Sequence, residues 1–93
     1  MPSIEIHKEF TGISPTDCYN AAENCVEDLG FSFVKKRPLG WLLQIKNKTI
    51  DANLAFRPGR ITTATFSLSS ESETEESLQA MAENMYIALQ ENL

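Results

Sequence analysis

The chain has 93 residues, of which 42% are apolar and 23% are charged. This composition is typical of one globular domain and excludes disordered, collagen-like and low-complexity chains. No apolar run reaches the roughly 18 residues that a membrane span needs, and the first residues lack the basic and apolar regions of a signal peptide. We therefore expect a single cytoplasmic domain over residues 1–93, without membrane contact.

The charge is unevenly distributed along the chain. The net charge is −5, yet residues 31–60 hold seven Lys and Arg against one Asp, which gives +6. Residues 1–30 sum to −5 and residues 61–93 to −6, so both flanks are acidic. Such asymmetry is informative about partners rather than about the fold.

The first two predicted elements are a strand and a helix. Apolar and polar residues alternate from Ile4 to Phe10, which is the period of a half-buried strand. Ser14 is suited to cap the first turn of a helix, and Pro15 fits the first helical position. Apolar residues then recur at three- and four-residue intervals until Gly30, which favours a helix end. The pattern predicts a helix from Pro15 to Leu29.

Four strand-like runs and a second helix follow. Turns of two or three residues separate the runs and can join only antiparallel neighbours, so the runs predict a meander. They are Phe31 to Arg37, Trp41 to Lys46, Thr49 to Arg57 and Arg60 to Leu68. Ser72-Glu73-Thr74-Glu75 has the form of a capping box, and a helical apolar stripe continues from it to Leu93.

Counting through the turns predicts which side of each strand faces the helices. With Phe33 inside, a three-residue turn pairs it with Ile45, and a two-residue turn pairs Ile45 with Ile50. The turn at Pro58-Gly59 allows two outcomes. A regular hairpin would turn Phe66 and Leu68 outward into an apolar patch, whereas a bulge near Gly59 returns them to the core, and we favour the bulge.

With that bulge, the uncovered sheet face is polar and of mixed charge. It is predicted to carry Lys36, Leu42, Gln44, Lys46, Thr49, Asp51, Asn53 and Arg57. The element order resembles that of the TATA-box-binding-protein half-repeat and of the wider helix-grip class. This resemblance covers the whole chain and implies an α+β fold, a five-stranded antiparallel sheet with two helices packed on one face, in the order β-α-β-β-β-β-α.

The sequence offers little chemistry. Cys18 and Cys25 lie seven residues apart on the predicted helix, about 10.5 Å along its axis, which is too far for a disulfide, so we expect buried free thiols. His7 between two glutamates is better explained as a charged edge strand than as a metal site. No nucleophile elbow and no phosphate-binding glycine loop is present. We expect no catalysis, no cofactor and no metal.

The charge pattern favours a noncatalytic binding or assembly module. Its basic hairpins would contact an acidic protein surface, including that of another copy, or nucleic acid. The expected contact residues are Lys35, Lys36, Arg37, Lys46, Lys48 and Arg57.

Two alternatives remain open. The first is an apolar ligand held between the sheet and the C-terminal helix, lined by Phe33, Trp41, Phe56, Met81 and Met85. The second is a homodimer through the uncovered sheet face, which follows if Phe66 and Leu68 point outward.

Overall fold

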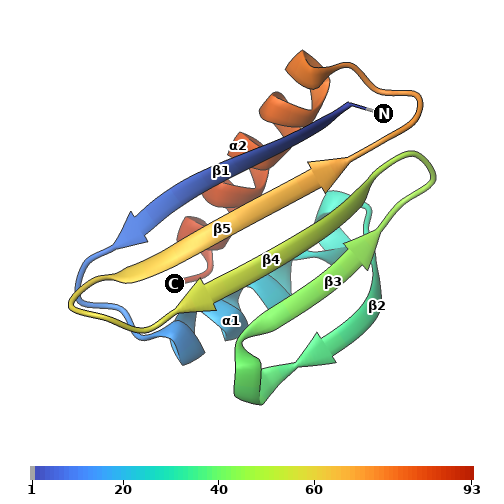
Figure 1. The fold of residues 1–93 in the computed structure, drawn as a ribbon. Helices are drawn as coiled ribbons and strands as arrows, with labels where there is room; N and C mark the ends of the chain where they lie inside the picture. The colour runs from blue at the N-terminus through green and yellow to red at the C-terminus, as the bar shows by residue number, and fades with distance from the viewer. Residues whose placement is uncertain (1) are drawn as a thin grey trace.

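The structure of residues 2–93, a computed structural model, contains five strands and two helices (Figure 1). In chain order these are β1 (Ser3–Phe10), α1 (Pro15–Cys25), β2 (Ser32–Arg37), β3 (Leu42–Lys46), β4 (Asp51–Arg57), β5 (Thr62–Ser69) and α2 (Glu75–Glu91). Two short 3-10 turns, Glu27–Leu29 and Pro38–Gly40, follow α1 and β2. The predicted order of elements is confirmed.

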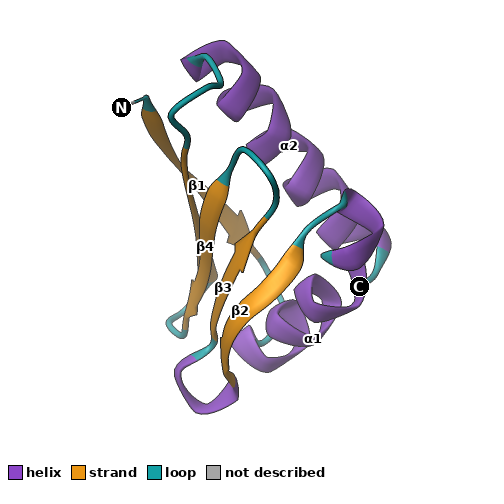
Figure 2. Ribbon diagram, turned by 90° about the vertical axis from the view of Figure 1, so that its right-hand side faces the viewer, coloured by secondary structure: helices purple, strands orange, loops and turns teal. Residues whose placement is uncertain are grey.

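All five strands belong to one antiparallel sheet in the order β1-β5-β4-β3-β2. The N-terminal strand β1 therefore lies beside the last strand, and β1 and β2 form the two edges. Both helices cover the same face of the sheet, as Figure 2 shows from the side. This is the predicted α+β architecture with one covered and one uncovered face.

Both helices begin with a side-chain cap, although the second begins later than predicted. The Oγ of Ser14 accepts a hydrogen bond of 3.1 Å from the amide of Asp17, as expected. The cap of α2 is Thr74 rather than Ser72. The buried hydroxyl of Ser70 accepts hydrogen bonds from the amides of Ser72 and Glu73 at 3.1 and 3.0 Å, which holds these residues in a turn before the helix.

The first helix is also shorter than predicted. It ends at Cys25, and the chain tightens into the 3-10 turn Glu27–Leu29 before Gly30, whose φ is 87°. Glycine adopts this left-handed conformation without steric cost, so the predicted stop at Gly30 holds even though the last turn is not α-helical.

The covered face forms the core, and its composition confirms the predicted faces of β1, β3, β4 and β5. Phe66 is fully buried and Leu68 is 1% exposed, so neither contributes to an outer patch. The apolar-patch dimer considered from the sequence is therefore excluded, because the residues that would form the patch lie in the core.

Two predicted registers are nevertheless wrong. Ile45 pairs with Ala52 and not with Ile50, because the side-chain oxygen of Asn47 accepts hydrogen bonds from the amides of Thr49 and Ile50 and closes a longer turn. The shift is two residues, which preserves the face of every side chain.

The connection between β4 and β5 also differs. Phe56 pairs with Ala64, and the strands continue in regular register from there. Phe66 and Leu68 reach the core because the five residues 58–62 separate the paired residues Arg57 and Thr63, not because of a bulge near Gly59.

The bulge lies in β2 instead. Phe33 pairs with Ile45 as predicted, but Lys35, not Val34, is the next paired residue, opposite Gln44. An extra residue in a strand turns all the following side chains to the other face. Lys35 and Arg37 therefore lie on the uncovered face, and the predicted placement of Lys36 there is wrong.

The two cysteines are buried and free, as predicted. Cys18 has no exposed surface, and the thiol of Cys25 donates to the carbonyl of Ala22 at 3.4 Å. Burial, together with the nearby charge of Asp17, raises the pKa of Cys18 from 9.0 to about 11. Burial also raises the pKa of Cys25.

Alkaline pH should therefore destabilise the fold through Cys18. The pKa of Cys18 is raised in the folded state. The full free energy of unfolding is therefore present below pH 9.0, and part of it is lost between pH 9.0 and about 11, where this thiol ionises only in the unfolded chain. Urea unfolding across this window should show a loss on the order of 2 kcal/mol that Cys18→Ala reduces. An equal loss in Cys18→Ala would contradict this assignment.

A second prediction concerns Tyr19, which is 4% exposed. Within residues 2–93 its hydroxyl is the buried side-chain polar atom without a hydrogen-bond partner in the protein. Removing an unpaired buried hydroxyl loses no bond and removes a desolvation cost of about 1–3 kcal/mol. Tyr19→Phe should leave the free energy of unfolding unchanged or raise it, as measured by urea titration. A clear loss of stability would show that the hydroxyl is bonded.

Candidate functional site

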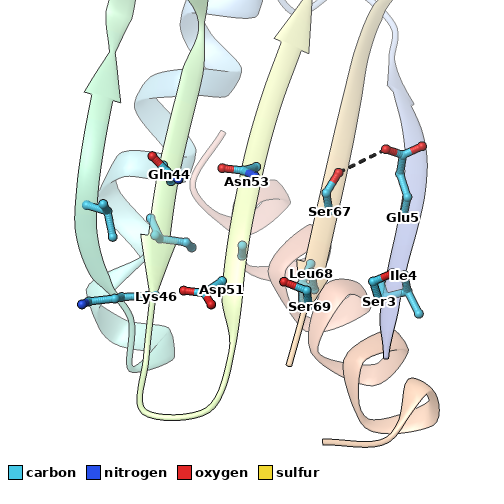
Figure 3. A pocket seen from close by; sticks show the side chains of 13 residues that line it. Ser3, Ile4, Glu5, Gln44, Lys46, Asp51, Asn53, Ser67, Leu68 and Ser69 are labelled. Carbon is cyan, nitrogen blue, oxygen red and sulfur yellow. Dashed lines mark hydrogen bonds between the residues drawn. The ribbon is translucent and has the colours of Figure 1, made fainter. Parts of the chain in front are cut away.

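The uncovered sheet face is built from cross-strand rows of polar side chains. One row runs Glu5, Ser67, Asn53, Gln44, and the next runs Ser3, Ser69, Asp51, Lys46. Figure 3 shows both rows projecting from the sheet. Successive side chains in a strand point to opposite faces of the sheet. These rows therefore lie on the uncovered face, and the residues between them in each strand pack against the helices.

These rows line a hollow of about 690 Å³ to which all five strands contribute. The only charged residues lining it are Lys46, Glu5 and Asp51, so its formal charge is −1. Ser67 donates a hydrogen bond of 3.2 Å to Glu5 across one side of it. The hollow offers hydrogen-bonding groups but no net positive charge, and it does not attract an acidic partner.

The predicted contact residues are divided among three places. Arg37 and Arg57 end β2 and β4, which run in the same direction, so both lie at the same end of the sheet. Lys46 ends the antiparallel strand β3 and lies at the opposite end, as does Lys48 in the following turn. The structure therefore does not join all the predicted cations into one surface.

Lys36 lies on the helix side of the sheet. Its Nζ is 3.5 Å from the carboxylate of Glu23 on α1 and 4.3 Å from the ring centroid of Phe33. Lys36 therefore links β2 to α1. Its charge already has a carboxylate partner within the protein, unlike the charges of Lys35 and Arg37.

Three other predicted cations, on β2 and β4, have no intramolecular carboxylate partner. The ion pairs within residues 2–93 are His7–Glu5, Lys8–Glu83 and Lys36–Glu23. Lys35, Arg37 and Arg57 are exposed and lie within 4 Å of no carboxylate in this part of the chain. Their positive charge is therefore not neutralised locally.

A leucine projects from the same end of the sheet. Leu39 lies in the turn Pro38–Gly40 between β2 and β3 and is 96% exposed. We call Lys35, Arg37, Leu39 and Arg57 the basic end; Lys35 stands one row further in, opposite Gln44 in the middle of β3. The sequence analysis did not identify Leu39, because a single apolar residue within a turn has no periodicity. The sequence feature that could have indicated its exposure is its position between a basic run and a tryptophan.

Trp41 holds this turn in a fixed shape. Its φ is 50°, a left-handed conformation that costs a non-glycine residue about 1–2 kcal/mol. Its indole nitrogen donates to Thr16 on α1 at 3.1 Å, and its carbonyl accepts a hydrogen bond from the amide of Phe56 at 2.9 Å. These contacts offset the strain, and the tip that carries Leu39 is thereby anchored to both layers of the fold.

The residues predicted to line an apolar ligand pocket form the core itself. Phe56 and Met85 are 2% and 1% exposed, so their side chains already fill the space between sheet and helices. Phe33, Trp41 and Met81 are half-buried and pack against the same cluster. A ligand could enter between sheet and helix only if these side chains moved apart.

His7 is engaged by its neighbours on the uncovered face. Its ring nitrogens lie 3.2 Å from a carboxylate oxygen of Glu5 and 3.1 Å from the hydroxyl of Thr65. Among residues 2–93, no three His, Cys, Asp or Glu side chains are grouped as a metal site would require. In the same range, no helix has the length and apolar character needed to cross a membrane.

Comparisons with known proteins identify the fold but no family. No family model and no curated protein matches the sequence. The crystal structure of TTHA0849 from Thermus thermophilus is similar with a TM-score of 0.63 and 11% identity, covering 98% of this chain and 93% of that one. The crystal structure of Ara h 8.0201 gives 0.55 and 4%, covering 95% and 94%. These similarities support a small α+β domain of the helix-grip type, and at such identities they show the fold alone.

Proposed function

We propose that the chain is a noncatalytic binding module that docks an acidic protein surface through its basic end. The observation that supports this most directly is the arrangement of three exposed cations without intramolecular carboxylates beside a leucine that is 96% exposed. Binding hot spots commonly combine an anchor that fills a pocket with a surrounding rim that excludes water. The basic end has the chemistry for both parts.

The charge distribution favours a protein over a nucleic acid as the partner. The cations of the uncovered face lie on β2, β3 and the central strand β4, whereas β1 carries Glu5 and Glu9 and the hollow is negative. A long polyanion crossing the face would meet these carboxylates and be repelled. A protein with a local acidic patch can contact the basic end alone.

The two ends of the sheet can be compared by charge reversal. We expect Lys35→Glu with Arg37→Glu to weaken binding of a polyglutamate probe at least tenfold at low salt, since it removes the attractive charges of the basic end. The matched pair Lys46→Glu with Lys48→Glu should weaken it far less. Fluorescence of Trp41, the only tryptophan, reports binding beside the hairpin tip.

Wild-type binding should disappear in about 1 M salt, where the screening length falls to about 3 Å. Equal losses in the two double variants would show that the probe responds to overall charge and not to the basic end. Absence of wild-type binding at low salt would refute the proposed function.

A further inference from the structure

A second hollow, shallow and widely open to solvent, lies beside the edge strand β1 and has an acidic rim. It lies between β1 and the first turns of α2 and has a volume of about 470 Å³. Its lining consists of Ile4, Glu75, Glu76, Gln79, Ala80 and Glu83. We call it the acidic hollow.

The floor and the rim of the acidic hollow differ in character. Ile4 and Ala80 provide apolar surface, and three glutamates carry the charge. Glu83 is paired with Lys8 at 3.2 Å, whereas Glu75 and Glu76 are exposed and have no cation within 4 Å in residues 2–93. The hollow thus pairs apolar surface with unneutralised negative charge.

The basic end has the complementary chemistry. It presents an exposed leucine flanked by cations, where the acidic hollow presents an apolar floor flanked by carboxylates. We propose that the acidic partner is a second copy of this chain, with Leu39 seated in the acidic hollow and Lys35 and Arg37 facing Glu75 and Glu76. This inference rests on the proposed function and specifies its partner.

One chain cannot make this contact with itself. Leu39 lies in the turn that follows the edge strand β2, and the acidic hollow lies at the β1 edge, with three strands between those edges. Figure 1 shows the β2–β3 turn at the bottom of the molecule and the start of α2 at the top. A contact between different surfaces leaves one basic end and one acidic hollow free, so it continues head to tail unless a ring closes.

Each contact should be weak and dependent on salt. The turn is already fixed by Trp41, so little order is lost on docking, but a single leucine and a few exposed ion pairs make a small interface. We expect a dissociation constant near 1 mM at low salt.

The first test measures the size of the wild-type chain and two variants by sedimentation at about 1 mM protein, the dissociation constant expected for a contact of this kind. Wild type should form species larger than dimers at low salt and dissociate in about 1 M salt. Leu39→Ser removes the anchor, and Ala80→Arg fills the hollow with a cation at an exposed helical position. Each variant alone should be monomeric, with unchanged circular dichroism.

Mixing the variants separates this contact from other modes of association. The Leu39→Ser chain keeps its acidic hollow and the Ala80→Arg chain keeps its basic end, so an equimolar mixture should form dimers and nothing larger. Leu93→Ser, which alters another exposed leucine, should assemble like wild type. The proposal is overturned if the mixture stays monomeric or if Leu39→Ser associates like wild type.

The polyglutamate experiment distinguishes failure of self-assembly from failure of the proposed function. A wild-type chain that binds polyglutamate through the basic end but remains monomeric overturns self-assembly and leaves the proposed function standing. A wild-type chain that does neither overturns both.

Discussion

Burial of one face of the sheet against two helices is the constraint on which the other features depend. Side chains from β3, β4 and β5 meet α1 and α2 there, and Leu43, Phe66 and Leu78 are all fully buried. Each large apolar side chain contributes about 1.5–3 kcal/mol by leaving water. These side chains fill the space between the sheet and the helices.

The covered face could be predicted from the sequence because it depends only on parity. Ile45 was assigned the wrong partner in β4, yet a shift of two residues returns every side chain to the same side. The twist of a Pro-Gly turn suits a two-residue hairpin poorly, which correctly predicts that Phe66 faces the core, although the loop is longer than expected and contains no bulge. Burial of apolar residues is a stronger constraint than the type of any one turn.

The site was less predictable because it depends on local irregularities. The extra residue Val34 in β2 has no distinctive sequence pattern, yet it decides that Lys35 faces outward and Lys36 faces α1. Strand direction separates Lys46 from Arg37, which a linear count of charges merges into one basic segment. Leu39 became visible only through its exposure, since an isolated apolar residue in a turn is ordinary in sequence.

The extra residue in β2 has an evolutionary consequence. Deleting Val34 would put the strand back in regular alternation, so that Lys36 would point to solvent while Lys35 and Arg37 would turn toward the acidic helix α1. Net charge would be unchanged, yet the surface offered to another molecule would be different. Loss or gain of one codon thus changes which cations the uncovered face presents while the net charge stays constant.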